Sequence, residues 1–172
     1  MTDYLDWGHK VVDVPAAGLR HEREATESER QAIAGALGLL ALNRLSARYR
    51  IEAISGGAYW LSGKISADVD QACVVTLEPV SARIEELFDV EFWPHLEGGD
   101  NDEEASVLDA PEVEKFEHGI IPAGRIIFET LAASLDPYPR REGVEFNWQD
   151  PQATEPEKAN PFAALSKLKD KD

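Results

Sequence analysis

The chain has 172 residues, of which 17 are Lys or Arg and 33 are Asp or Glu, so its formal charge is −16. This length suits one domain with a sizeable core, and a hydrophobic content of 43% excludes a wholly disordered chain. The charge excludes the overall basic surface that holds nucleic acid or acidic membranes, and it favours a basic partner.

The cysteine content and the apolar stretches predict a cytoplasmic protein. Cys73 is the only cysteine, so neither an intrachain disulfide nor a zinc site made of several thiolates can form. The most apolar stretch, residues 32–42, is too short to cross a bilayer, and residues 1–4 lack the basic start of a signal peptide. We therefore expect no membrane association, cofactor, metal or small-molecule substrate.

The first elements are a short strand and a capped helix. The β-branched run at residues 9–14 predicts the strand. Thr26 and Glu29 have the spacing of a capping box, which predicts a helix from there to about Leu37, with Gly38 as its end. The predicted helix carries an apolar stripe of Ile33, Leu37 and Leu40.

Three alternating segments follow, and they predict an antiparallel meander. Apolar and polar residues alternate over residues 45–54, 59–73 and 80–92, and Gly56 with Gly57 suits a tight turn between the first two. Glu86 interrupts the apolar face of the third segment, so we expect a bulge or a short helical turn there.

The second half of the chain contains an acidic segment, a helix and a tail. Residues 97–117 hold nine acidic residues and one lysine without apolar periodicity, which predicts a mobile acidic loop. Pro122 suits the first turn of an amphipathic helix that reaches Leu135. The expected fold is one α+β domain over residues 1–146, with an antiparallel meander and two or three helices, followed by a polar tail over residues 147–172 that ends in a short amphipathic segment.

No catalytic motif is present, so we predict no enzyme and no catalytic residues. Neither a phosphate-binding glycine pattern nor a nucleophile elbow occurs, and the four histidines are widely spaced. Cys73 falls on the apolar side of an alternating segment, which indicates a packed side chain. A hydrolase that uses Cys73 or a carboxylate pair is the least favoured alternative.

The cations are concentrated on one predicted strand. Arg44, Arg48 and Arg50 lie around Tyr49, and Lys64 is expected on the neighbouring strand. A positive strip with an aromatic residue is typical of RNA contact. The alternative is a sheet face on which these arginines pair across strands with carboxylates such as Glu52 or Asp68.

Three local strings follow one another along the chain, with the acidic segment between the first two. The first is residues 71–79, QACVVTLEP. The second is residues 117–121, EHGII, with the helix that ends in residues 134–139, SLDPYP. The third and most specific is residues 158–169, KANPFAALSKLK. Together they resemble the YceD family of large ribosomal RNA subunit accumulation proteins.

The resemblance implies a cytoplasmic, non-enzymatic protein that supports accumulation of the large-subunit (23S) ribosomal RNA. Many family members carry C-x-x-C in the first string, where this chain has Cys73 and Thr76, so no role of a cysteine pair carries over. We expect Cys73, Leu77 and Pro79 to shape the turn between two strands.

Two binding hypotheses follow. In the first, a basic ribosomal or assembly protein binds the acidic loop and the terminal segment, whose candidate contacts are Asn160, Pro161, Phe162, Leu165, Leu168 and Lys169. The alternative for that segment is that it folds back on its own domain. In the second, ribosomal RNA binds directly to Arg44, Arg48 and Arg50.

Overall fold

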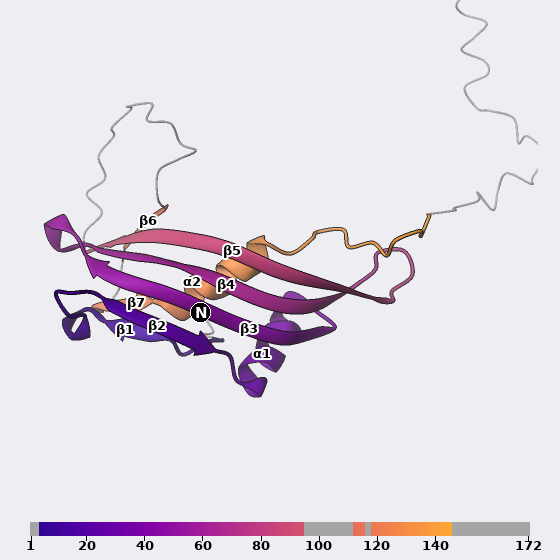
Figure 1. Cartoon of the computed structure of the whole chain (residues 1–172), viewed down its shortest axis with the longest axis horizontal. Coiled ribbons are helices and arrows are strands. Elements are labelled where there is room, and N and C mark those ends of the chain that lie inside the picture. The colour runs from indigo at the N-terminus through magenta and orange to yellow at the C-terminus, as the bar shows by residue number, and fades with distance from the viewer. Residues whose placement is uncertain (1–3, 95–111, 116–117, 146–172) are drawn as a thin grey trace, which may run out of the picture. The chain divides into compact units, whose positions relative to one another are not determined.

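The computed structural model describes residues 4–94, 112–115 and 118–145, and these form the expected α+β fold (Figure 1). A five-stranded sheet has the order β2-β3-β4-β5-β6, and β1 and β7 form a separate two-stranded sheet. Residues 97–111 of the acidic segment and all six candidate contacts of the terminal segment lie outside the described residues. The strands are β1 Gly8–Lys10, β2 Leu19–Glu24, β3 Ala41–Ala53, β4 Tyr59–Ala72, β5 Pro79–Trp93, β6 Glu112–Lys115 and β7 Ile120–Pro122; the α-helices are α1 Glu27–Leu37 and α2 Ala123–Ala133.

The start and end of α1 follow the prediction. The side chain of Thr26 accepts from the backbone N–H of Glu29, and the backbone N–H of Thr26 donates to the Glu29 carboxylate at 2.7 Å. Gly38 ends the helix in the left-handed conformation, with φ of 65°. Both signals are local, which is why the sequence alone indicates them.

Removing the capping hydroxyl is expected to destabilise the protein modestly. Thr26→Ala should lower the free energy of unfolding by about 1 kcal/mol, because one backbone N–H of the first turn loses its acceptor. Urea denaturation followed by circular dichroism measures this change. Thr26→Ser keeps the hydroxyl and should retain most of the stability; equal losses in both variants would contradict a capping role.

The predicted meander is confirmed as β3, β4 and β5, each antiparallel to the next. Pairing between β4 and β5 runs without a break from Tyr59 opposite Phe92 to Ala72 opposite Pro79. The bulge or helical turn expected at Glu86 is therefore wrong. Glu86 lies opposite Ile65 in regular register and its side chain is exposed, so the strand accommodates a charge without distortion.

Two strands of the large sheet were not predicted, and the first strand of the chain, which belongs to the small sheet, is shorter than expected. Strand β6 lies within the segment expected to be a loop and pairs in parallel with residues 90–93 of β5. Strand β2 pairs along its whole length with β3. In the first strand region only Gly8–Lys10 is extended, and Val11–Asp13 forms a 3₁₀ turn.

The two faces of the large sheet differ. On the inner face, side chains from β3, β4 and β5 pack with residues of α1, α2 and the small sheet into one core. The most deeply buried include Leu45, Ile51, Leu61, Ile65, Phe92, Ile33, Ile127 and Leu131. The opposite face carries the polar half of each alternating strand, and we call it the open face. The candidate site lies there.

Candidate nucleic-acid interface

Four cationic side chains meet on the open face because the register of three strands aligns them. Arg20 of β2 lies opposite Arg50 of β3, and Arg48 of β3 lies opposite Lys64 of β4. Period-two alternation directs Arg48 and Arg50 away from the buried Tyr49 between them. The structure thus places Arg48, Arg50 and Lys64 together, as the sequence analysis expected.

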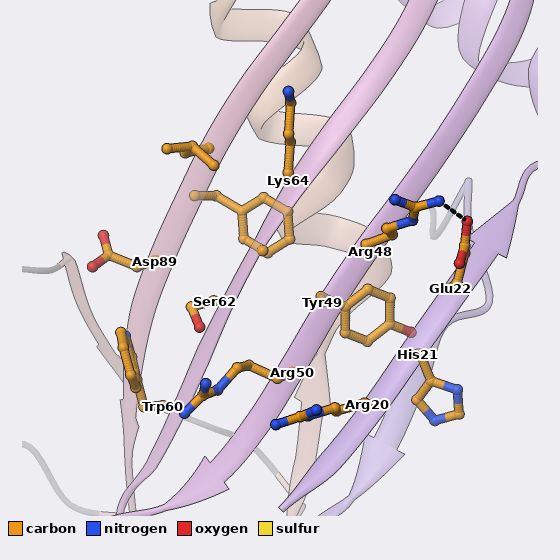
Figure 2. Close-up of a pocket in the computed structure, with 13 residues that line it drawn as sticks. Arg20, His21, Glu22, Arg48, Tyr49, Arg50, Trp60, Ser62, Lys64 and Asp89 are labelled. Carbon is orange, nitrogen blue, oxygen red and sulfur yellow. Dashed lines mark ion pairs between the residues drawn. The ribbon is translucent and has the colours of Figure 1, made fainter.

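These side chains surround a hollow with a volume of about 910 Å³. Figure 2 shows Arg20 beside Arg50, with Arg50 extending toward Trp60, whereas Arg48 turns toward Glu22 and Lys64 extends away from the other cations. We call this region the cationic hollow, because four Lys or Arg residues line it against two carboxylates. Its lining residues are Arg20, His21, Glu22, Arg48, Tyr49, Arg50, Trp60, Ser62, Gly63, Lys64, Leu87, Phe88 and Asp89.

Most of these cations also form ion pairs on the sheet surface. Arg48 pairs with Glu22 at 2.8 Å (dashed in Figure 2). Lys64 pairs with Glu85 at 2.7 Å. Their side chains are largely exposed, so each pair contributes at most about 1 kcal/mol and opens readily for a competing anion.

The pairing alternative raised by the sequence is confirmed in part. Arg48 pairs across strands with Glu22, whereas Arg50 pairs with Glu52, the carboxylate that alternative named, within β3 itself. Arg44 pairs with Glu24 instead, at 3.6 Å, and it does not line the cationic hollow. Among the described residues no ion pair involves Asp68, although Asp68 lies opposite Arg44 in the register. The three predicted arginines therefore divide between the hollow and a neighbouring ion pair.

Two residues of the hollow were missed by sequence reasoning. The guanidinium carbon of Arg50 lies 5.6 Å from the centroid of the Trp60 ring, a cation–π arrangement. The alternation that places Lys64 on the open face also places Trp60 there, so a signal for Trp60 existed. Arg20 carried no such signal, because its contact with Arg50 depends on the unpredicted strand β2.

A histidine pair lies on the inner side of the same strands. His9 Nε2 is 2.8 Å from the hydroxyl oxygen of Tyr49, and the ring of His21 stacks on that of His9 with centroids 4.7 Å apart. Burial, the neighbouring His21 and the charge of Arg23 lower the pKa of His9 to about 4. Burial raises the pKa of Tyr49 to about 12. Both groups are therefore neutral at physiological pH.

The turn between β4 and β5 holds the three residues expected to shape it. The backbone N–H of Leu77 donates to Cys73 O at 2.9 Å, and that of Cys73 donates to Glu78 O at 2.8 Å. Cys73 has no exposed surface, and hydrogen bonds from the Thr76 side chain and from backbone groups, including that of Arg141, lower its pKa to about 6. Leu77 is 75% exposed with φ of 62°, and Pro79 begins β5.

Comparison with known proteins places the chain in a family. No helix in the described ranges is long and apolar enough to span a membrane. No curated protein and no solved structure matches the chain significantly. Residues 61–169, well over half of the chain, match the family described as large ribosomal RNA subunit accumulation protein YceD. These residues include the turn at Cys73, helix α2 and the terminal segment, the three strings on which the resemblance rested. The chain belongs to the YceD family of large ribosomal RNA subunit accumulation proteins.

Proposed function

We propose that this chain is a non-enzymatic cytoplasmic factor that supports accumulation of large-subunit ribosomal RNA and contacts that RNA through the cationic hollow. The family description supplies the role in accumulation. The observation that carries the contact is the convergence of Arg20, Arg48, Arg50 and Lys64 from three strands, beside Trp60, in a chain whose overall charge is −16. Such a cluster of cations, three of which are held in surface ion pairs, suits a polyanion whose phosphates replace the paired carboxylates.

The hollow combines the two interactions that bind unpaired RNA. Guanidinium and ammonium groups bind phosphates, and exchange of Glu22 for a phosphate at Arg48 replaces one exposed ion pair by another. Trp60 supplies a ring on which a base can stack, an interaction worth about 1–3 kcal/mol per base. The surrounding carboxylates restrict binding to the hollow, since they repel phosphates elsewhere on the sheet.

Loss of two cations from the hollow is expected to lower the affinity for RNA and to make that affinity less sensitive to salt. We expect Arg20→Gln combined with Arg48→Gln to raise the dissociation constant for a 23S rRNA fragment about tenfold near 0.1 M salt. The slope of log affinity against log salt should become shallower by about 1.5, because binding releases fewer counterions when two phosphate contacts are lost. Gel-shift titrations at several salt concentrations measure both quantities.

A matched control separates the hollow from overall charge. Lys10→Gln combined with Arg140→Gln removes the same charge from exposed residues that do not line the hollow, and it should change the dissociation constant less than about twofold. Trp60→Ala should weaken binding without altering the salt slope. No gel shift at low salt, or equal losses in the two double variants, would contradict RNA contact at the hollow.

The second candidate is that the factor works through a basic ribosomal or assembly protein. In the described part of the chain, an acidic groove between β5 and α2 favours it, because Glu86, Glu112 and Glu129 line this groove without a neighbouring Lys or Arg in its lining. Residues 97–111 and the terminal segment, on which the sequence analysis based this hypothesis, lie outside the described residues.

A further inference from the structure

Among the described residues, strand β5 has a neighbouring strand on only one side along most of its length. On one side, β4 pairs with β5 from Pro79 to Phe92. On the other side, β6 joins only at residues 90–93, and the described residues provide no strand beside residues 79–89. We call residues 79–89 the free edge. An unpaired edge presents backbone N–H and C=O groups that can pair with an added strand.

The acidic groove adjoins one end of this edge, at residues 86–89. It has a volume of about 650 Å³ and lies between β5, the first residue of β6 and helix α2. Phe88, Val90 and Ile126 supply its apolar part. The groove is therefore suited to an extended chain that pairs its backbone with β5 and inserts alternate side chains against an apolar surface.

The negative charges of the groove favour a bound segment that is positively charged. Four carboxylates line it, those of Glu86, Asp89, Glu112 and Glu129. Glu129 is held by Arg125 Nη1 at 3.1 Å. Within the described residues, the other three make no ion pair with Lys, Arg or His. The groove thus keeps the carboxylates of Glu86 and Glu112 free for basic side chains of a bound segment, and Asp89 lies where the groove meets the cationic hollow.

The same charges disfavour a second copy of this chain as the occupant. Edge-to-edge pairing of two β5 strands would bring Glu86 and Asp89 of one copy toward the same carboxylates of the other, which is destabilising. A charge on an edge strand is a known means of preventing such self-association. A strand that carries lysine or arginine meets no such repulsion.

We propose that the free edge of β5 binds an extended, lysine- or arginine-bearing segment of a partner protein by strand addition, with the segment lying in the acidic groove. This proposal deepens the second candidate function by naming the site and the mode of binding. The groove and the cationic hollow share Leu87, Phe88 and Asp89 of β5. Their other charged groups differ, because Glu86 lies on the inner face of β5 whereas Arg48 and Lys64 belong to the open face of the sheet.

Hydrogen exchange on the full chain, followed by NMR, tests this proposal with a defined probe. The probe is a ten-residue synthetic peptide in which lysine alternates with valine. In the free protein, alternate amides of residues 80–89 should exchange fast, because only half of them face β4. A saturating amount of the probe should slow these amides about tenfold or more.

Matched variants and probes decide the outcome. Glu86→Lys should raise the dissociation constant of the probe about tenfold or more, whereas Glu142→Lys, the same charge change outside the groove, should leave it nearly unchanged. A probe with proline at alternate valines keeps its charge but lacks the N–H donors at those positions, and it should protect the edge much less.

Three results would overturn strand addition. The first is equal weakening by both variants, and the second is equal protection by the proline probe. The third is slow exchange of the edge amides in the free protein, since a segment of the same chain would then already cover the edge. None of these results bears on the RNA gel shift, so the two proposals fail separately.

Discussion

Gly63→Ala is expected to destabilise the protein by about 3 kcal/mol or more, although it adds a single methyl group. A Cβ at this position would lie 2.5 Å from the carbonyl oxygen of Arg48, 2.7 Å from Tyr49 Cβ and 2.8 Å from Phe88 Cζ. The first two atoms belong to paired backbone or are fixed to it, so they cannot move aside without disturbing the β3–β4 pairing. Thermal denaturation should show a melting temperature lower by roughly 6–12 °C.

Gly35→Ala is the matched control for this substitution. Gly35 is exposed within α1, and a Cβ there meets nothing within 4 Å. Alanine restricts the unfolded chain and favours the helix, so this variant should be more stable by about 0.5–1 kcal/mol. If Gly63→Ala were as stable as the unmodified protein, the close packing of β3, β4 and β5 at this point would be contradicted.

Acidification is expected to destabilise the protein through His9. Folded His9 takes up its proton near pH 4, whereas the unfolded chain takes it up near pH 6.5. Between these values the unfolded state binds more protons, so the free energy of unfolding falls as pH falls and is fully recovered above about pH 7. The loss attributable to His9 should reach roughly 2–3 kcal/mol by pH 4.5.

A variant without a titrating ring isolates this effect. His9→Gln keeps a polar group opposite the Tyr49 hydroxyl but does not ionise. Urea denaturation of both proteins from pH 4.5 to pH 7.5 should give a steeper pH dependence for the unmodified chain. Carboxylates whose pKa the fold lowers, such as Glu85 beside Lys64, titrate in both proteins and cancel in the difference. Parallel curves would show that His9 does not control acid stability.

The parts of the fold that the sequence predicts are those with local signals. The capping box at Thr26 and the alternation of β3, β4 and β5 each involve neighbouring residues, and both are confirmed. Strand β2 gave no usable pattern, because His21 and Arg23 occupy its inner positions where apolar residues are expected. Strand β6 has one apolar residue, Val113, and its parallel pairing with β5 is a long-range property.

The cationic hollow shows the same division. Alternation on β3 and the hairpin at Gly56 and Gly57 suffice to bring Arg48 beside Lys64. The contribution of Arg20 depends on strand β2, and no local sequence pattern predicts that strand. The acidic groove was not predicted at all, because its walls come from β5, β6 and α2, and their proximity is set by tertiary packing.

Pairing of β1 with β7 has a consequence for how the chain acquires its structure during synthesis. The strands Gly8–Lys10 and Ile120–Pro122 are more than a hundred residues apart, whereas β3, β4 and β5 are neighbours in the chain. At about 5–20 residues per second, β7 is synthesised roughly one to six seconds after the end of β5. During that interval the meander exposes an unfinished apolar face, and the pairing of β1 with β7 is expected to form last.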